Sequence, residues 1–260
     1  MLEFLKYFFG QGSEIEFRLF TLAHILPVIV AIAVILLIYK FRNQIASFKY
    51  EKVVRMTFGF ILIITEMSYY WRIASVTSLE RGPLTELPIS ICGWVLILSS
   101  FLVNTKSQTL YDIVYFWLFS GTLLAVITPT AISYTGPTRF RYYQFWMAHT
   151  FGYVTLMYMT FIHKMRPTWK SMAKSGIALF ILAMIATFAN NVLGDGANYL
   201  YMATVEDTAS LLNILPKNYW LKMLVMAVAV GTLFVLSYLP WLIKDKKAKK
   251  EEIEKNIATS

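Results

Sequence analysis

The sequence predicts an all-α membrane protein that crosses the bilayer several times, and two properties of its composition carry this prediction. Of the 260 residues, 57% are hydrophobic and only 15% are charged, whereas a soluble domain usually carries about 25% charged residues. The apolar residues are also gathered into runs that approach the roughly 20 residues needed to cross a bilayer as a helix. We therefore expect a single helical domain over residues 1–243, followed by a charged cytoplasmic tail over residues 244–260.

Seven apolar runs qualify as membrane spans, and the third is the least secure because it is short and has polar flanks. The runs cover residues 19–39, 53–75, 88–103, 109–129, 141–163, 175–193 and 218–243. Before the first run, residues 1–12 place several aromatic side chains around Lys6 in a stretch too short to span. Such a composition favours a helix that lies in the membrane interface.

The distribution of basic residues predicts the orientation of the seven spans. The net charge is +9, but the basic residues lie in short tracts beside apolar runs rather than in a nucleic-acid-binding motif, so we expect no nucleic-acid partner. Sixteen Lys and Arg residues fall on the side that holds the 40–55 loop and the C-terminus, and seven fall on the other side. Because cytoplasmic loops are enriched in Lys and Arg, we expect an outer N-terminus and a cytoplasmic C-terminus in a cell membrane, as in a bacterial plasma membrane.

The only cysteine, Cys92, follows a proline at the start of the third run. Pro88 is suited to a first helical turn because it lacks the N–H that would have no partner there, and Cys92 would then lie about 6 Å further along the helix. A single cysteine excludes an internal disulfide and a cysteine-cluster metal site, and we expect no metal and no cofactor. Cys92 is either a small packing residue or a reactive thiol just below the membrane surface.

Five polar residues inside the predicted spans fall in the same, outer half of the membrane. They are Glu66, Cys92, His149, Asn190 and Asn191. Ionisable groups inside a bilayer usually face a bundle interior or a water-filled cavity, so one shared pocket open to the outer side explains them together. Two alternatives stay open: asparagines also serve as hydrogen-bonding contacts between membrane helices, and a buried histidine such as His149 also serves as the donor or acceptor of a structural hydrogen bond.

The chemistry that fits these residues is nucleophilic acyl transfer. A histidine within reach of a buried thiol can take its proton, form the thiolate and later protonate a leaving alcohol. Glu66 or an asparagine would orient the imidazole, which is the role of the third member of hydrolytic triads. Donors to the developing oxyanion would come from the same pocket, namely Tyr69, Tyr70 or Asn190.

The sequence also resembles a known family. The motifs that carry the resemblance are Leu87-Pro88 with Cys92, His149 in Trp146-Met147-Ala148-His149, Gly196-Ala197-Asn198-Tyr199-Leu200-Tyr201, Ser210-Leu211-Leu212 and Pro216. They look like the bacterial YwaF family of integral membrane proteins, whose animal relative is transmembrane protein 164. The resemblance implies an acyltransferase that moves a fatty acyl group between phospholipids or lysophospholipids through an acyl-cysteine. Cys92 and His149 match its catalytic pair.

The outer loop over residues 194–217 is predicted to close over the pocket. Asp207 is suited to cap an amphipathic helix there, and the substrate-binding or lid residues would be Asn198, Tyr199, Leu211 and Leu212. Two rival classes remain: a seven-helix transporter or sensor that binds a lipid or solute without catalysis, and a scaffold whose polar residues only join helices. The inverted repeats and broken helices of many transporters are absent from the sequence. The sequence identifies no protein partner.

Overall fold

The computed structural model describes the chain except for residues 11–16, 77–85, 130–134, 195–196, 204–213 and 259–260. Every regular element of the described residues is helical, as predicted. In chain order the elements are α1 (Leu2–Phe9), α2 (Leu22–Lys40), α3 (Arg42–Ala46), α4 (Glu51–Ser75), α5 (Ile91–Thr105), α6 (Gln108–Trp117), η2 (Leu118–Thr122), α7 (Leu123–Ile127), α8 (Phe140–Phe161), α9 (Trp169–Leu193), η4 (Tyr199–Tyr201) and α10 (Tyr219–Ala258).

Five helical segments of the described residues are long and apolar enough to cross a membrane. They are α2, α4, the continuous segment from α6 to α7, α9 and α10. The predicted third and fifth spans correspond to α5, which has 15 residues, and α8, which has 22. α5 is shorter than the five, and α8 is of spanning length but is not among them.

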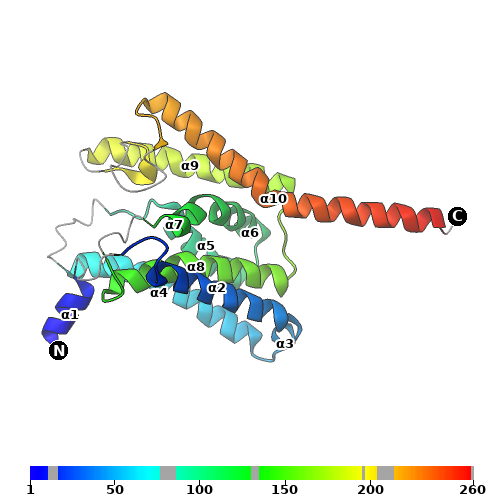
Figure 1. Ribbon diagram of the computed structural model, residues 1–260, viewed down its shortest axis with the longest axis horizontal. Coiled ribbons are helices and arrows are strands. Elements are labelled where there is room, and N and C mark those ends of the chain that lie inside the picture. The colour runs from blue at the N-terminus through cyan, green and yellow to red at the C-terminus, as the bar shows by residue number, and fades with distance from the viewer. Residues whose placement is uncertain (11–16, 77–85, 130–134, 195–196, 204–213, 259–260) are drawn as a thin grey trace.

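The helices form a bundle in which α5 and α8 lie centrally. α4 packs against α5 and α8, α2 packs against α8, and α6 packs between α5 and α9. Figure 1 shows α2, α4 and α8 on one side of the molecule, with α9 and α10 on the other and α6 and α7 between them. α10 contacts the bundle through its middle, where Phe234 stacks on Phe116 and the Ser237 carbonyl accepts from Tyr115.

Local signals explain where several helices begin. α9 starts at Trp169, six residues before the predicted run, because Thr168 and Ser171 form a capping box in which each side chain bonds to the other's backbone. The helix of the predicted fourth span contains a π-helical segment, η2, that no apolar pattern indicates. α10 continues through the charged tail to Ala258 instead of ending near residue 243.

The predicted N-terminal helix is present as α1 and is held by two buried arginines. Arg72 of α4 donates to the carbonyls of Phe9 and Gly10, each at 2.7 Å. Arg139 donates to the Tyr7 carbonyl and lies 3.5 Å from the centroid of the Tyr7 ring. The C-terminal end of a helix leaves carbonyls without intrahelical partners, and the arginines satisfy them. α1 is thereby fixed to the same end of the bundle as Glu66.

Candidate functional site

Cys92 lies in the first turn of α5, closer to the helix start than the sequence predicts. The helix begins at Ile91 because the Ser90 hydroxyl accepts from the Gly93 amide and acts as the N-cap. Pro88 therefore precedes the helix rather than opening it. Cys92 is half-buried, and its position next to free amide N–H groups is one where negative charge is favoured.

Glu66 projects from α4 against the start of α5. Its side chain is buried, with 5% of the residue exposed. A Cβ atom placed on Gly93 would lie 2.4 Å from the Glu66 Oε1 atom, which means that the carboxylate occupies the space of a missing side chain. The Tyr70 side chain, one turn further along α4, interacts with the carboxylate. Because Gly93, which follows Cys92, has no side chain, the buried Glu66 carboxylate can lie against the helical turn that carries the Cys92 thiol.

Arg141 of α8 is the common neighbour of the charged and nucleophilic groups. It interacts electrostatically with Glu66, Cys92 and His149. Its guanidinium carbon lies 4.4 Å from the centroid of the Tyr69 ring, and it donates to the Gln144 side chain of its own helix. A cation at the centre of this cluster offsets the cost of burying the carboxylate.

Gln144 and Tyr69 join the cluster to the rest of the bundle. The Gln144 amide donates to the Thr65 carbonyl at 3.2 Å and so connects α8 to α4. The Tyr69 hydroxyl donates to the Glu86 carboxylate at 2.8 Å, just before α5. Tyr69 and Tyr70 thus lie near the carboxylates of Glu86 and Glu66, and the role of oxyanion donor expected of them stays a prediction.

His149 is buried on α8, one turn from Phe145. Its Nδ1 atom lies 2.7 Å from the Phe145 carbonyl, and its ring stacks on the Phe145 ring with centroids 3.9 Å apart. A carbonyl only accepts hydrogen bonds, so Nδ1 carries the proton in the neutral ring and Nε2 is left as the basic nitrogen. His149 can therefore make a structural hydrogen bond through Nδ1 and still accept a proton at Nε2.

The thiol itself contacts the π-helical segment. The Thr122 hydroxyl of η2 donates to the Cys92 sulfur at 3.7 Å. The neighbouring Gly121 permits this approach, because a Cβ there would lie 2.9 Å from the Ile91 side chain. π-helical turns occur often at functional sites because they re-aim side chains. Cys92 and His149 form no hydrogen bond with each other in the described structure, and their predicted separation of about 5 Å stays a prediction.

The two asparagines of α9 lie in different surroundings. The Asn190 side chain bonds to both backbone groups of Tyr199, accepting from its N–H at 2.8 Å and donating to its carbonyl at 3.2 Å. The Tyr199 hydroxyl accepts from the Leu87 amide at 2.9 Å. Asn190 therefore holds the loop after α9 against the segment before α5. Asn191 is exposed on α9.

Only part of the predicted lid lies among the described residues. Asn198 accepts from the Ala203 amide at 3.0 Å and shapes the loop, and Tyr199 connects it to Leu87 as above. Leu211, Leu212 and the predicted cap Asp207 lie outside the described residues. The amphipathic helix predicted there stays a prediction.

Three residues of the cluster, Arg141, Thr122 and Gly93, are not among the site residues that the sequence predicts. The spacing of Arg141 offers a signal, because it lies eight residues before His149 and so falls on nearly the same helical face. Within the described residues there is no group of three or more His, Cys, Asp or Glu arranged to hold a metal ion.

These features define the chain as a multi-pass α-helical membrane protein with a buried polar cluster where α4, α5 and α8 meet. The model of the TMEM164 family matches residues 19–238. The chain therefore belongs to the TMEM164 family, as its resemblance indicates, while the YwaF branch within it stays a prediction. No curated protein and no solved structure matches the chain.

Proposed function

We propose that the chain is a membrane-embedded acyltransferase that moves a fatty acyl group between phospholipids or lysophospholipids, with Cys92 as the nucleophile. The observation that carries this proposal is that the Cys92 thiol accepts from Thr122 of η2 while the buried Glu66 carboxylate of α4 lies against Gly93, the residue after Cys92. A cysteine that only fills space needs no such neighbours. Family membership supports the same reading.

In the first half-reaction the Cys92 proton passes to Nε2 of His149, and the thiolate attacks the carbonyl carbon of a lipid ester. The tetrahedral oxyanion then collapses, the carbon–oxygen bond to the glycerol breaks, and His149 returns the proton to the leaving alkoxide. A thioester on Cys92 remains. This step requires Nε2 to come within hydrogen-bond reach of the thiol, and such contacts often tighten only when substrate is bound.

In the second half-reaction the hydroxyl of an acceptor lysophospholipid gives its proton to His149 and attacks the thioester carbon. The carbon–sulfur bond breaks, and the thiolate recovers a proton from His149. Arg141 would stabilise the oxyanion in both steps, because its charge acts on Cys92 and His149 alike. Glu66 holds Arg141 in position. Water in place of the acceptor would give hydrolysis.

The proposed topology has seven spans, with α5 and α8 included, an outer N-terminus and a cytoplasmic C-terminus. It places the cluster in the outer half of a cell membrane, facing outer-leaflet lipid. Support comes from the uneven distribution of basic residues. In a Cys92→Ser background, impermeant labelling of single cysteines should reach the 194–217 loop from outside and the 40–55 loop only after permeabilisation. Labelling of both from the same side contradicts this topology.

The activity test uses the purified protein in liposomes with a labelled donor phospholipid and a lysophospholipid acceptor. Cys92→Ser should reduce transfer to background, and His149→Ala should reduce it by about 10²- to 10⁴-fold. The double variant should be no worse than Cys92→Ser, since the two residues act as a unit. A hydroxylamine-sensitive acyl group should be found on Cys92 by mass spectrometry.

His24→Gln serves as the matched control. His24 is also a buried histidine near the same end of the bundle, but its ring nitrogens bond to the Val126 carbonyl and the Phe20 amide. It should affect stability and leave transfer unchanged. Full activity of a folded Cys92→Ala variant would overturn the mechanism. The alternative function, lipid or solute binding without catalysis, would then account for the cluster.

A further inference from the structure

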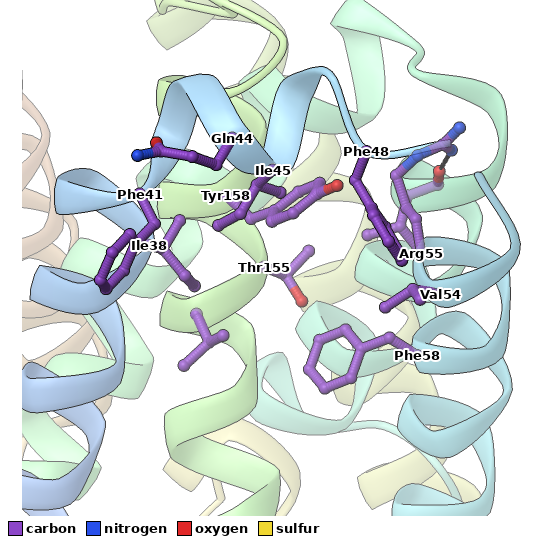
Figure 2. Close-up of a pocket in the computed structure, with 12 residues that line it drawn as sticks. Ile38, Phe41, Gln44, Ile45, Phe48, Val54, Arg55, Phe58, Thr155 and Tyr158 are labelled. Atoms are coloured by element: carbon purple, nitrogen blue, oxygen red, sulfur yellow. Dashed lines mark hydrogen bonds between the residues drawn. The ribbon is translucent and has the colours of Figure 1, made fainter. Parts of the chain in front are cut away.

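A cavity lies toward the other end of the bundle from Cys92. It has a volume of about 540 Å³ and is bounded by α2, α3, α4, α5 and α8. Arg55, which lines it, is 11 residues from Glu66 on α4, or about 16 Å along the helix. Figure 2 shows aromatic and aliphatic side chains from these helices turned toward one space. The apolar lining consists of Ile38, Phe41, Ile45, Phe48, Val54, Phe58, Val103 and Val154.

One hydroxyl in this apolar lining has no partner. Thr155 is fully buried, and its Oγ1 atom makes no hydrogen bond. Figure 2 shows its side chain projecting from α8 into the space between Tyr158 and Phe58. Its neighbours on the same helix behave differently, because Thr150 and Thr160 each donate to the carbonyl four residues earlier. A buried hydroxyl without a partner costs free energy, and a ligand carbonyl would remove that cost.

The other buried polar groups of the lining are already engaged. The Tyr158 hydroxyl donates to Glu51 at 2.6 Å, and Arg55 bonds to Glu51 and to the Val103 carbonyl. Thr155 is therefore the group that a ligand would meet with its hydrogen-bonding capacity unused. An empty apolar cavity of this size is costly in a packed bundle, whereas its volume lies within the range of small-molecule sites, about 300–1,000 Å³.

The chain around the cavity mouth is basic. Between residues 38 and 55 the single acidic residue is Glu51, and its carboxylate accepts from three side chains. Lys40, Lys49 and Lys52 are exposed in the same stretch. Charges arranged in this way attract an anionic lipid headgroup.

We propose that this cavity binds one acyl chain of an anionic membrane phospholipid. The chain lies among the apolar side chains, the ester carbonyl accepts from Thr155, and the phosphate lies at the basic mouth. The site is separate from the polar cluster around Cys92, and its occupancy does not depend on acyl transfer. No covalent step is involved.

The test measures lipid binding by native mass spectrometry of the full chain carrying Cys92→Ser, so that no turnover occurs. The probes are lysophosphatidylglycerol and lysophosphatidylcholine with the same acyl chain. We expect one lysophosphatidylglycerol to bind about tenfold more tightly than lysophosphatidylcholine. Thr155→Val should weaken both lipids by about fivefold, because it removes a hydrogen bond to an ester that both contain. Lys40→Gln with Lys49→Gln should weaken only the anionic lipid.

Two further variants distinguish a loss of lipid binding from a loss of folding. Ile45→Trp should fill the cavity and abolish binding, while Val228→Trp on the exposed face of α10 should leave it unchanged. Thr150→Val is the control for Thr155→Val, because its hydroxyl bonds within its own helix. The proposal is overturned if a folded Ile45→Trp protein binds as the parent does, or if Thr155→Val and Thr150→Val bind alike. Equal binding of the two lipids overturns the anionic headgroup assignment.

Discussion

Helix α4 carries two carboxylates, Glu51 near its start and Glu66 near its end, and they have different surroundings. Glu51 accepts from Arg55 at 2.7 Å, Tyr158 at 2.6 Å and His163 at 3.1 Å. Glu66 interacts with Tyr70 and lies against a glycine, with Arg141 as its nearby cation. Glu51 joins α4 to the end of α8 through three hydrogen bonds that all reach its Oε1 atom. Glu66 is placed beside a thiol, and this difference separates a structural carboxylate from a candidate functional one.

Replacing each carboxylate by the isosteric amide should affect a different property, namely acyl transfer for Glu66 and stability for Glu51. Glu66→Gln leaves the shape of the cluster but removes the charge that holds Arg141, so we expect acyl transfer to fall by about 100-fold. Glu51→Gln weakens three hydrogen bonds at the other end of α4, and it should lower the free energy of unfolding by ~1–3 kcal/mol while leaving transfer nearly unchanged.

The two readouts are initial transfer rate in liposomes and thermal unfolding in detergent. Tyr158→Phe is the matched control for Glu51→Gln, because it removes one of the same hydrogen bonds without touching the carboxylate. Tyr158→Phe should lower the free energy of unfolding less than Glu51→Gln does. If Glu66→Gln destabilises the protein and retains full transfer, Glu66 is a structural carboxylate like Glu51 and has no part in the reaction.

Gly93 provides a second test of the placement of Glu66. A methyl group there would lie 2.4 Å from Oε1 of Glu66 and 2.9 Å from the Ser90 hydroxyl, so the carboxylate has to move. We expect Gly93→Ala to reduce transfer by about tenfold and to cost ~1–3 kcal/mol of stability. Transfer rate and unfolding temperature are again the measurements.

Gly176→Ala is the control for this substitution. Gly176 also lies within a helix, but nothing lies within 4 Å of an added Cβ. Alanine favours a helix over glycine by up to about 1 kcal/mol, so this variant should be neutral or slightly more stable. Wild-type transfer by Gly93→Ala would show that the carboxylate's approach to the thiol has no part in the reaction.

The helices were largely predictable from the sequence, and the contacts of the cluster were not. Each of the seven predicted apolar runs corresponds to a helical segment, because burial in lipid requires long apolar stretches whatever the packing. The start of α5 differed because the Ser90 cap, a local hydrogen bond, overrides the proline signal. Five segments of the described residues are long and apolar enough to cross a membrane, and the other two predicted runs correspond to α5 and α8.

The site residues expected from the sequence stay a prediction, and the structure shows only which neighbours they have. Glu66 lies against Gly93 in the first turn of α5, and Tyr69, on the same face of α4, donates to Glu86 before that helix. The role of Arg141 depends on how α8 is rotated against α4, which no single-helix pattern contains. Likewise, apolar periodicity cannot indicate that η2 adopts a π-helical turn and brings Thr122 to the thiol.

The smallest expected effect on transfer concerns Asn190 and Asn191 of α9, for which the sequence predicts the same role. Asn190 is buried and its amide is saturated by the backbone of Tyr199, whereas Asn191 is exposed. A buried polar side chain whose donor and acceptor groups both bond to the backbone is expected to have a structural role. Asn190→Ala should therefore lower the free energy of unfolding by ~1–2 kcal/mol, increase proteolysis of the loop after α9, and reduce transfer by only a few-fold through the loop's contact with Leu87. Asn191→Ala should change none of the three. A loss of transfer as large as that of Glu66→Gln, without destabilisation, would instead place Asn190 in the reaction and show that saturated hydrogen bonding does not identify structural residues in this protein.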